Sequence, residues 1–463
     1  MNAKTFNIIG SSGKTIGYLF ITILALLSAR CNSDEGQILL EEDASGVHET
    51  DNEMDEDSKG NPLTQVTRIT PGGINEGDFF GYEIAANETF TVASAPFSDE
   101  KGQRTGAVYI FMRNGTKFEN TAHIIYPELA TTEDYFGWSI ALDGEVLVVG
   151  APRNDSMAEN AGLAYVYEHV GNNNWNMIRQ LAAPNPQPNQ EFGTRVAIEA
   201  ETIAISSKFD DDNYFDEGDI TNGAGVAQGS VFLFENVNNW EYTQKLIPNS
   251  GQGHKWDAFG AAIAIQNGSI AVGAPGTDNT TYKFPGSVYV FKASNETWTL
   301  QSRIEASDGK SEDFFGVEVV LDDADLAIGA SGSFNSLLPN SNQAYGAIYT
   351  FVETGEIWKE DSKLIPDDVL PGDNFGGSGL AFHEAYLVAG ASLSEELTAG
   401  NGAIYFFKRE SGWPESHKVI APDPLNEDLF GSSVAATTDL IFAGAHRRCN
   451  ETGCWAGALY FIQ

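Results

Sequence analysis

The chain is predicted to be all-β and to fold as a seven-bladed β-propeller, with a four-stranded antiparallel sheet in each blade. Three observations predict this fold. The dipeptide Phe-Gly returns seven times at intervals of about 55 to 67 residues, each interval holds four short strands separated by turn residues, and the two ends of the repeat region complement each other. A repeat of this length with four strands per unit is typical of propellers.

Each repeat carries the same landmarks in the same order. The Phe-Gly pairs begin at Phe80, Phe136, Phe192, Phe259, Phe315, Phe375 and Phe430. An Asp stands two positions before the Phe in every copy except the third, which has Gln190 there. A triplet of mostly small residues follows the Phe after about fourteen positions, and a Gly then opens a strand with alternating aromatic residues.

The residue types predict where each strand lies in its blade. The first strand is rich in small residues, as in Ile84–Ala86 and Val434–Ala436, so it fits the crowded centre of the ring. The second strand ends in the small triplet, and the third begins with the Gly. The fourth follows an aromatic residue and in most copies runs into a Pro, as from Trp175 to Pro184.

The ends of the repeat region predict how the ring closes. The seventh copy stops at Gln463 after its third strand, whereas the segment from Leu63 to Pro71 resembles the fourth strands of the other copies. We therefore expect this segment to complete the last blade, which removes open sheet edges. Residues 63–463 are then one propeller, although the chain length alone would suggest three domains.

The first 31 residues are predicted to direct export. Lys4 and Lys14 precede an apolar run from Thr15 to Ala29, which is typical of a signal peptide, and Cys31 follows at the position of a bacterial lipoprotein's acylated cysteine. Arg30 departs from the small residue expected before such a cysteine. Cleavage near Ala29 with simple secretion, and a retained anchor, stay open as alternatives.

Composition limits the partners of the chain. The 463 residues include 65 Asp and Glu against 26 Lys and Arg, a net charge of -39. Residues 32–62 are polar and acidic and are predicted to be a disordered tether, yet most of the negative charge falls on the propeller. Such a surface repels nucleic acid and anionic lipid, so we expect contact with a membrane only through the N-terminal segment.

The repeated Phe-Gly and Gly-Ala-Pro landmarks from Leu63 to Gln463 resemble the FG-GAP repeat, the blade of integrin alpha-chain propellers and of many bacterial surface proteins. The resemblance implies extracellular adhesion and protein recognition. The integrin type carries a calcium loop between its first two strands, but here tight turns such as Asp143-Gly144 and Asn267-Gly268 stand in that place. A calcium ion needs six to eight oxygens, so we expect no metal and no cofactor.

Strand parity predicts the binding face, because the loops after strands two and four emerge at one end of a propeller. All the variation in loop length falls after strand two, and the third-blade loop combines acids with aromatic residues. It offers these candidates for a cation or a basic partner: Phe209, Asp210, Asp211, Asp212, Tyr214, Phe215, Asp216 and Asp219. The alternative is a solvated insertion without a ligand.

The seventh such loop offers a second candidate site. Cys449 and Cys454 are predicted to form a small disulfide ring, which suits an exported protein. Arg447, Arg448 and Trp455 stand beside them as a basic and aromatic recognition spot in an acidic chain. The alternative is that the arginines pair with nearby carboxylates.

The sequence predicts a monomeric, non-enzymatic, extracellular module that binds a protein or a glycan through the loops after strands two and four. Searches for nucleophile, zinc and phosphate-binding motifs find no catalytic site. The alternatives are a secreted hydrolase or lyase with its site at the central mouth, and a structural component of the surface or matrix. Because Ala, Val, Ile and Gly dominate the inner strands, we expect few polar groups at that mouth.

Overall fold

The computed structural model describes the chain from residue 65 onward with several gaps. The described ranges are 65–118, 122–127, 131–172, 174–210, 228–237, 239–248, 257–277, 284–294, 297–332, 344–395, 398–449 and 453–463. The predicted export segment, Cys31 and the acidic tether lie outside them. Within these ranges, no helix is long and apolar enough to span a bilayer.

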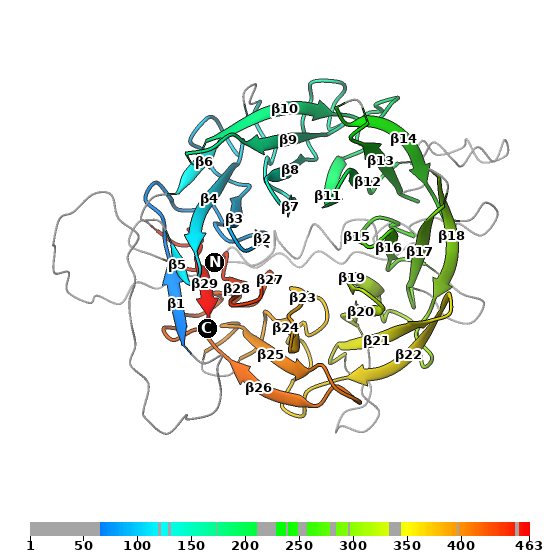
Figure 1. Ribbon diagram of the computed structural model, residues 1–463. Helices are drawn as coiled ribbons and strands as arrows, with labels where there is room; N and C mark the ends of the chain where they lie inside the picture. Colours follow the sequence, from blue (N-terminus) through cyan, green and yellow to red (C-terminus); the bar gives the residue numbers. More distant parts are fainter. Residues whose placement is uncertain are drawn as a thin grey trace, which may run out of the picture. The chain divides into compact units, whose positions relative to one another are not determined.

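The described strands form seven antiparallel sheets arranged as blades around a central axis (Figure 1). The first blade contains β2 (Ile84–Ala86), β3 (Phe90–Ala95), β4 (Ala107–Asn114), β5 (Lys117–Phe118) and β6 (His123–Ile125). The second contains β7 (Ile140–Asp143), β8 (Val146–Ala151), β9 (Leu163–His169) and β10 (Trp175–Leu181). The third contains β11 (Phe192–Glu199), β12 (Thr202–Ser207), β13 (Ser230–Glu235) and β14 (Glu241–Leu246).

The remaining four blades repeat this order. The fourth contains β15 (Ala262–Gln266), β16 (Ser269–Ala274), β17 (Ser287–Ser294) and β18 (Thr297–Ile304). The fifth contains β19 (Phe315–Asp322), β20 (Asp325–Ala330), β21 (Ala347–Thr354) and β22 (Ile357–Leu364). The sixth contains β23 (Leu380–Phe382), β24 (Tyr386–Ala391), β25 (Ala403–Lys408) and β26 (Glu415–Val419). The seventh contains β27 (Val434–Ala436), β28 (Ile441–Gly444), β29 (Leu459–Ile462) and β1 (Val66–Ile69).

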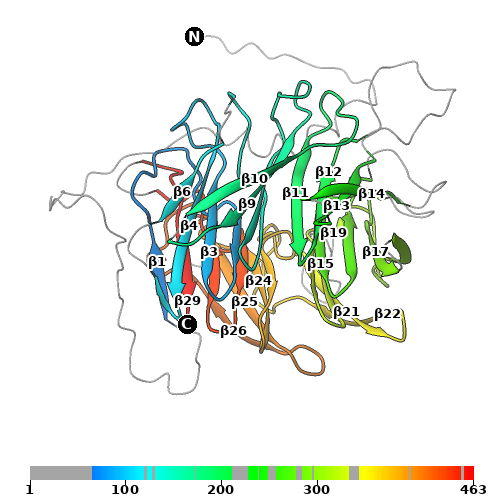
Figure 2. The same ribbon diagram turned by 45° about the horizontal axis from the view of Figure 1, so that its top comes forward.

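The first strand of each blade is the innermost, as predicted. β2, β7, β11, β15, β19, β23 and β27 surround the axis, and each contacts the first strands of the neighbouring blades. Strands such as β11 and β12 run from one end of the ring to the other, so their connecting loops emerge at the two ends (Figure 2).

The early strand β1 lies at the outer edge of the seventh blade. It pairs antiparallel with β29, from Val66 opposite Ile462 to Ile69 opposite Leu459. The pairing continues through Gln65 and Gln463, whose backbone N–H groups each donate to the other's carbonyl oxygen at 3.2 and 3.1 Å. This is the pairing expected from the complementary ends of the repeat region.

The Phe of each Phe-Gly pair anchors its own blade. Its buried ring meets an aromatic ring of the third strand with centroids 5.2 to 5.6 Å apart in all seven blades. These pairs are tilted or edge-to-face, which is the arrangement that ring quadrupoles favour. The third blade keeps the contact although Phe232 replaces the usual Tyr.

Glycines of the motif lie where neighbouring blades meet. The Gly that opens each third strand has φ between 79 and 95°. A Cβ added there would lie 1.8 to 2.1 Å from the carbonyl oxygen of the next blade's motif Phe. The Gly of the small triplet is equally close to the next blade's Phe-Gly, as at Gly150 against Gly193. The repeated glycines therefore allow backbone contact between blades.

The Asp two positions before the motif Phe closes a turn in five blades. In the first, second, fifth, sixth and seventh blades its carboxylate accepts the backbone N–H three residues earlier at 2.7 to 2.8 Å. In the third blade the amide oxygen of Gln190 accepts the same bond from Gln187 at 3.1 Å. The third copy thus has Gln in place of Asp but keeps the same hydrogen bond.

The turns between the first and second strands are too short to wrap a cation. They contain two residues in the second to fifth blades, as between Asp143 and Val146. Side chains of these turns bond the turn of a neighbouring blade, as Asp143 accepts from the Ala200 N–H at 2.6 Å and Glu199 from the Asn267 N–H at 2.7 Å. Among the described residues, no group of three or more His, Cys, Asp or Glu is placed to hold a metal ion.

Candidate functional site

The loops after strands two and four lie side by side at one end of the ring, as strand parity predicted. The loop after strand two of each blade bonds the segment that leads into the next blade. The backbone N–H of Phe79 donates to the Trp455 carbonyl at 3.0 Å, and the Glu133 N–H donates to the Gln103 carbonyl at 2.8 Å. We call this end of the propeller the loop face.

Two positions of every blade lie on the loop face. The first immediately precedes the motif Phe and has a left-handed backbone, with φ of 52 to 62° in all seven blades. It is occupied by Phe79, Tyr135, Glu191, Ala258, Phe314, Asn374 and Leu429. The second immediately follows the small triplet and is occupied by Phe97, Arg153, Phe209, Gly276, Gly332, Leu393 and Arg447.

Large aromatic residues concentrate on the first, second and seventh blades. The Phe97 ring centroid is 4.7 Å from that of Phe79 and 5.2 Å from that of Tyr135, so Phe97 bridges two blades. Nearer the axis, the Tyr82 and Trp138 centroids are 5.1 Å apart, and His446 lies 5.4 Å from Tyr82. We call this continuous set the aromatic arc: Phe79, Tyr82, Phe97, Tyr135, Trp138, His446 and Trp455.

Most of the aromatic arc is accessible. Phe79, Tyr82, Phe97, Trp138 and His446 are half-buried, and Trp455 is 39% exposed. Burial and the adjacent Arg447 charge lower the pKa of His446 to about 3, so its imidazole is neutral near pH 7. The arc therefore presents a firm, mainly apolar surface on an otherwise acidic protein.

An arginine follows the aromatic residues at each end of the arc, at the position after the small triplet. Arg153 lies over the Tyr135 ring, 5.4 Å from its centroid, and its Nε is 3.5 Å from a Glu191 carboxylate oxygen. Arg447 occupies the corresponding position in the seventh blade. Its buried Nε makes no hydrogen bond within the described ranges, and burial lowers its pKa.

A charged bridge crosses the axis next to the aromatic arc, which corrects the expected apolar mouth. Arg195 Nη1 is 3.4 Å from Glu83 Oε2, its Nη2 is 3.1 Å from Glu318 Oε1, and its Nε donates to the Ala261 carbonyl at 3.0 Å. These side chains come from the first, third and fifth blades. They line a cavity of about 430 Å³ to which all seven blades contribute residues, most of them from the first strands.

Burial shapes the charges of this bridge. It raises the pKa of Glu83 to about 7 and raises that of Glu318, although Arg195 opposes both shifts. Burial alone would lower the pKa of Arg195, but the Glu318 and Glu83 carboxylates raise it above its usual value. Each of the three residues lies three positions after the motif Phe of its blade. The sequence analysis did not identify this position as charged.

The third-blade loop is described only at its two ends, up to Asp210 and from Gln228. Asp211, Asp212, Tyr214, Phe215, Asp216 and Asp219 lie outside the described residues. Asp210 is 2% exposed, and its carboxylate accepts from Ser230 Oγ and contacts Lys245 Nζ, both at 2.5 Å. Its prediction as a ligand-binding residue is corrected, because it stabilises the base of the loop. Phe209 is half-buried with Lys208 Nζ 5.5 Å from its ring centroid.

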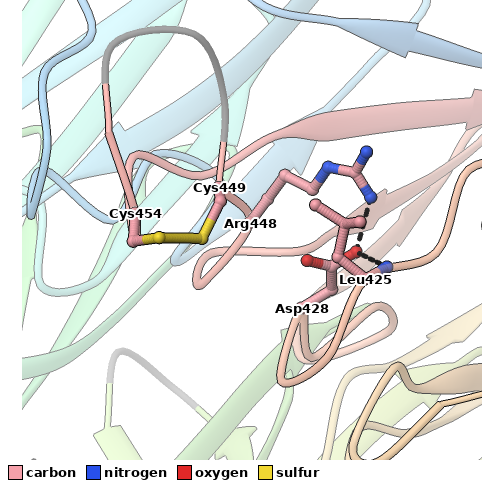
Figure 3. Close-up of a disulfide and its surroundings, with 5 residues drawn as sticks. All are labelled: Leu425, Asp428, Arg448, Cys449 and Cys454. Carbon is pink, nitrogen blue, oxygen red and sulfur yellow. Dashed lines mark hydrogen bonds and ion pairs between the residues drawn. A yellow bond between two sulfur atoms is a disulfide. The ribbon is translucent and has the colours of Figure 1, made fainter. Parts of the chain in front are cut away.

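The seventh-blade loop contains the predicted Cys449–Cys454 disulfide (Figure 3). Arg448 is 5% exposed, and its guanidinium bonds the Asp428 carboxylate at 2.6 Å and the Asp423 carboxylate at 2.9 Å. Asp428 also accepts the Leu425 N–H at 2.7 Å. The prediction of Arg448 as a recognition residue is corrected, because Arg448 pairs with carboxylates inside the protein.

These features define a seven-bladed propeller whose loop face carries an aromatic and basic surface. A family model, the FG-GAP repeat, matches residues 63–111, 122–167, 240–291, 298–351 and 413–462, more than half of the chain. The chain therefore belongs to the FG-GAP repeat family. The unmatched stretches include most of the third and sixth blades, where the structure nevertheless keeps the repeated aromatic contact. No match was found among curated proteins.

Proposed function

We propose that the protein is a non-enzymatic binding module that recognises an extracellular protein or glycan through its loop face. The aromatic arc is the observation that carries this proposal. Contiguous, partly exposed aromatic residues on a rigid scaffold are characteristic of recognition surfaces. The FG-GAP propeller fold is compatible with such a role.

The cellular location belongs to the same proposal. We infer that residues 1–31 direct export and that Cys31 attaches the protein to the cell surface or outer membrane, with simple secretion as the alternative. The Cys449–Cys454 disulfide supports an oxidising compartment. The net charge of -39 supports partners other than nucleic acid or anionic lipid.

Protein and glycan arrays probed with the full-length protein test this function. The expected result is retention by at least one immobilised ligand, with loss of retention for Phe97→Ala. The matched control is Tyr242→Ala, because Tyr242 is 43% exposed on outer strand β14, away from the loop face. Retention by no ligand, or equal loss in both variants, contradicts a binding role for the loop face.

The charged bridge favours a second candidate function, a hydrolase or lyase at the central mouth. Glu83 faces the axial cavity with a pKa of about 7, which suits a general acid or base near neutral pH. Arg195 beside it could stabilise a developing negative charge. Its contacts with two carboxylates and a carbonyl also suit a purely structural role.

Polysaccharide turnover distinguishes this second function. Release of reducing ends or unsaturated products by the full-length protein, abolished in Glu83→Gln, would establish an enzyme. Absence of turnover across neutral and acidic polysaccharides, with binding intact, would leave the binding module as the function.

A further inference from the structure

We propose that the aromatic arc binds a polysaccharide that carries carboxylates, with sugar rings against the aromatic residues and a sugar carboxylate on Arg447. This inference rests on the proposed binding function and names its ligand class. Three observations support this ligand class: the shape of the arc, its polar groups without a hydrogen bond to described residues, and the charge of Arg447.

The shape of the arc favours sugar rings. Each aromatic residue is held by at least one other, with neighbouring centroids 4.7 to 6.2 Å apart, so little side-chain freedom is lost when a ligand binds. The C–H faces of pyranose rings are flat and apolar, and they complement aromatic surfaces. A continuous arc across three blades can contact more than one sugar ring.

Two polar groups on the arc are available for sugar hydroxyls. Neither the Tyr82 hydroxyl nor the Trp138 Nε1 makes a hydrogen bond to another residue in the described part of the chain, and neither is a fully buried orphan. Both residues are half-buried and adjoin each other near the axis. They can therefore orient a sugar that lies against their rings.

Arg447 supplies the charge preference. Its guanidinium makes no ion pair in the described ranges, and Glu427 acts on it only through longer-range attraction. Among the residues that the structure describes, no group accepts a hydrogen bond from its buried Nε. The net charge of -39 repels a polyanion at long range, as it does nucleic acid, but salt near physiological strength screens that repulsion beyond about 8 Å. At contact distance the half-buried Arg447 guanidinium favours a carboxylate from outside the protein, since such a charge-assisted bond is stronger than a neutral one.

The loop face is less suited to an extended acidic peptide. Peptides commonly bind by adding a strand to an exposed edge. Around the arc, however, backbone groups already bond each other, as Phe79 N–H does with the Trp455 carbonyl and Tyr135 N–H with the Arg104 carbonyl at 3.2 Å. Recognition here falls to side chains, which favours a glycan.

Isothermal titration of the full-length protein with polygalacturonate tests the proposal. Methyl-esterified polygalacturonate keeps the sugar backbone without the charge, and poly-glutamate keeps the charge without the sugar. We expect binding to polygalacturonate, with affinity at least about tenfold weaker for the esterified polymer and for poly-glutamate. Equal binding of poly-glutamate would overturn the glycan assignment.

Variants locate the interaction. Arg447→Gln and Trp138→Ala are each expected to weaken polygalacturonate binding at least about tenfold. The controls Arg179→Gln and Tyr242→Ala, on outer strands β10 and β14, are expected to leave it unchanged. Trp138→Phe keeps a ring for stacking and is expected to retain most of the affinity, even if Trp138→Ala fails to fold.

The outcome separates this inference from the proposed function. Binding of a neutral glycan or a protein, lost in the arc variants, would overturn the acidic-polysaccharide assignment and support the binding module. Polygalacturonate binding that the arc variants leave intact would overturn the assignment of the arc. Failure to bind any arrayed ligand would contradict the proposed function as well.

Discussion

Single residues decide how the blades fit together. Gly286 has φ of 86°, and a Cβ there would lie 2.1 Å from the Phe315 carbonyl oxygen of the next blade. Both the backbone angle and the close approach exclude a side chain, so Gly286→Ala must separate two blades or distort the turn. We expect it to lower the free energy of unfolding by at least about 2 kcal/mol, measured by urea denaturation.

The control for this change is Gly355→Ala. Gly355 also has a positive φ, 57°, but nothing lies within 4 Å of its missing Cβ. Its substitution is expected to cost about 1 kcal/mol, from the backbone angle alone. Equal losses in the two variants would show that contact between blades does not constrain Gly286.

Buried carboxyl groups predict an unusual pH dependence of stability. Burial raises the pKa of Asp78, Asp313 and Asp428 to about 6 from an ordinary value of 3.8. Between these values the folded state binds more protons than the unfolded state, so stability falls as pH rises. We expect a higher melting temperature at pH 5 than at pH 7.5, with a smaller difference in Asp313→Asn. A melting temperature that rises over this interval would contradict this account.

Sequence reasoning reaches some residues and misses others for definable reasons. The Phe-Gly register is visible because every blade needs the same ring and glycine contacts. Arg447 and Arg448 are adjacent in the sequence, yet only Arg448 reaches Asp428 and Asp423. Composition cannot separate two neighbouring arginines, because their partners come from a distant segment.

Among the strands, β1 pairs with the partner that is most distant from it in the sequence, β29. Ile69 is fully buried and packs in the cluster that contains Phe442 and Leu459 of the seventh blade. Ile69→Ala is expected to reduce the free energy of unfolding by about 2 to 4 kcal/mol, measured by urea denaturation. Exposed Gln65→Ala is the control, with an expected change below about 0.5 kcal/mol. An unchanged stability in Ile69→Ala would mean that β1 does not complete the blade.

The short turns after the first strands predict independence from calcium. A calcium site needs a loop that supplies six to eight oxygens, and a two-residue turn cannot provide them. Elemental analysis of the purified protein is expected to find no stoichiometric calcium, and a chelator is expected to leave the melting temperature unchanged. One tightly held calcium per molecule, or a clear destabilisation by the chelator, would contradict this prediction.

Element-level prediction succeeded where a repeated pattern exists. Strand order, the inner position of small-residue strands and the end at which the long loops emerge all follow from periodicity and parity. The charged bridge of Glu83, Arg195 and Glu318 was missed because the other four blades have Ser or Ala at the same position, three residues after the motif Phe. No repeated charge therefore marks this position in the sequence. Only the ring brings these residues together from blades far apart in the sequence.

At the scale of the whole molecule, a regular scaffold carries an irregular surface. The seven blades repeat the same backbone contacts, but the residues at the two loop-face positions vary. They include Phe79, Phe97 and Tyr135 in the first two blades, whereas the fourth blade has Ala258 and Gly276 there. The scaffold was predictable because its contacts recur seven times. The aromatic arc was not predictable, because it depends on which positions of the repeat place their side chains on the surface.

The central claim is that the protein binds its ligand through the aromatic arc. The most direct measurement compares the affinity of Phe97→Ala with that of Ile357→Ala, an exposed apolar residue in β22, for a ligand retained by the wild type. The account predicts at least about tenfold weaker binding for Phe97→Ala and wild-type affinity for Ile357→Ala, with both variants folded. Wild-type affinity in Phe97→Ala, or loss only in Ile357→Ala, would contradict it.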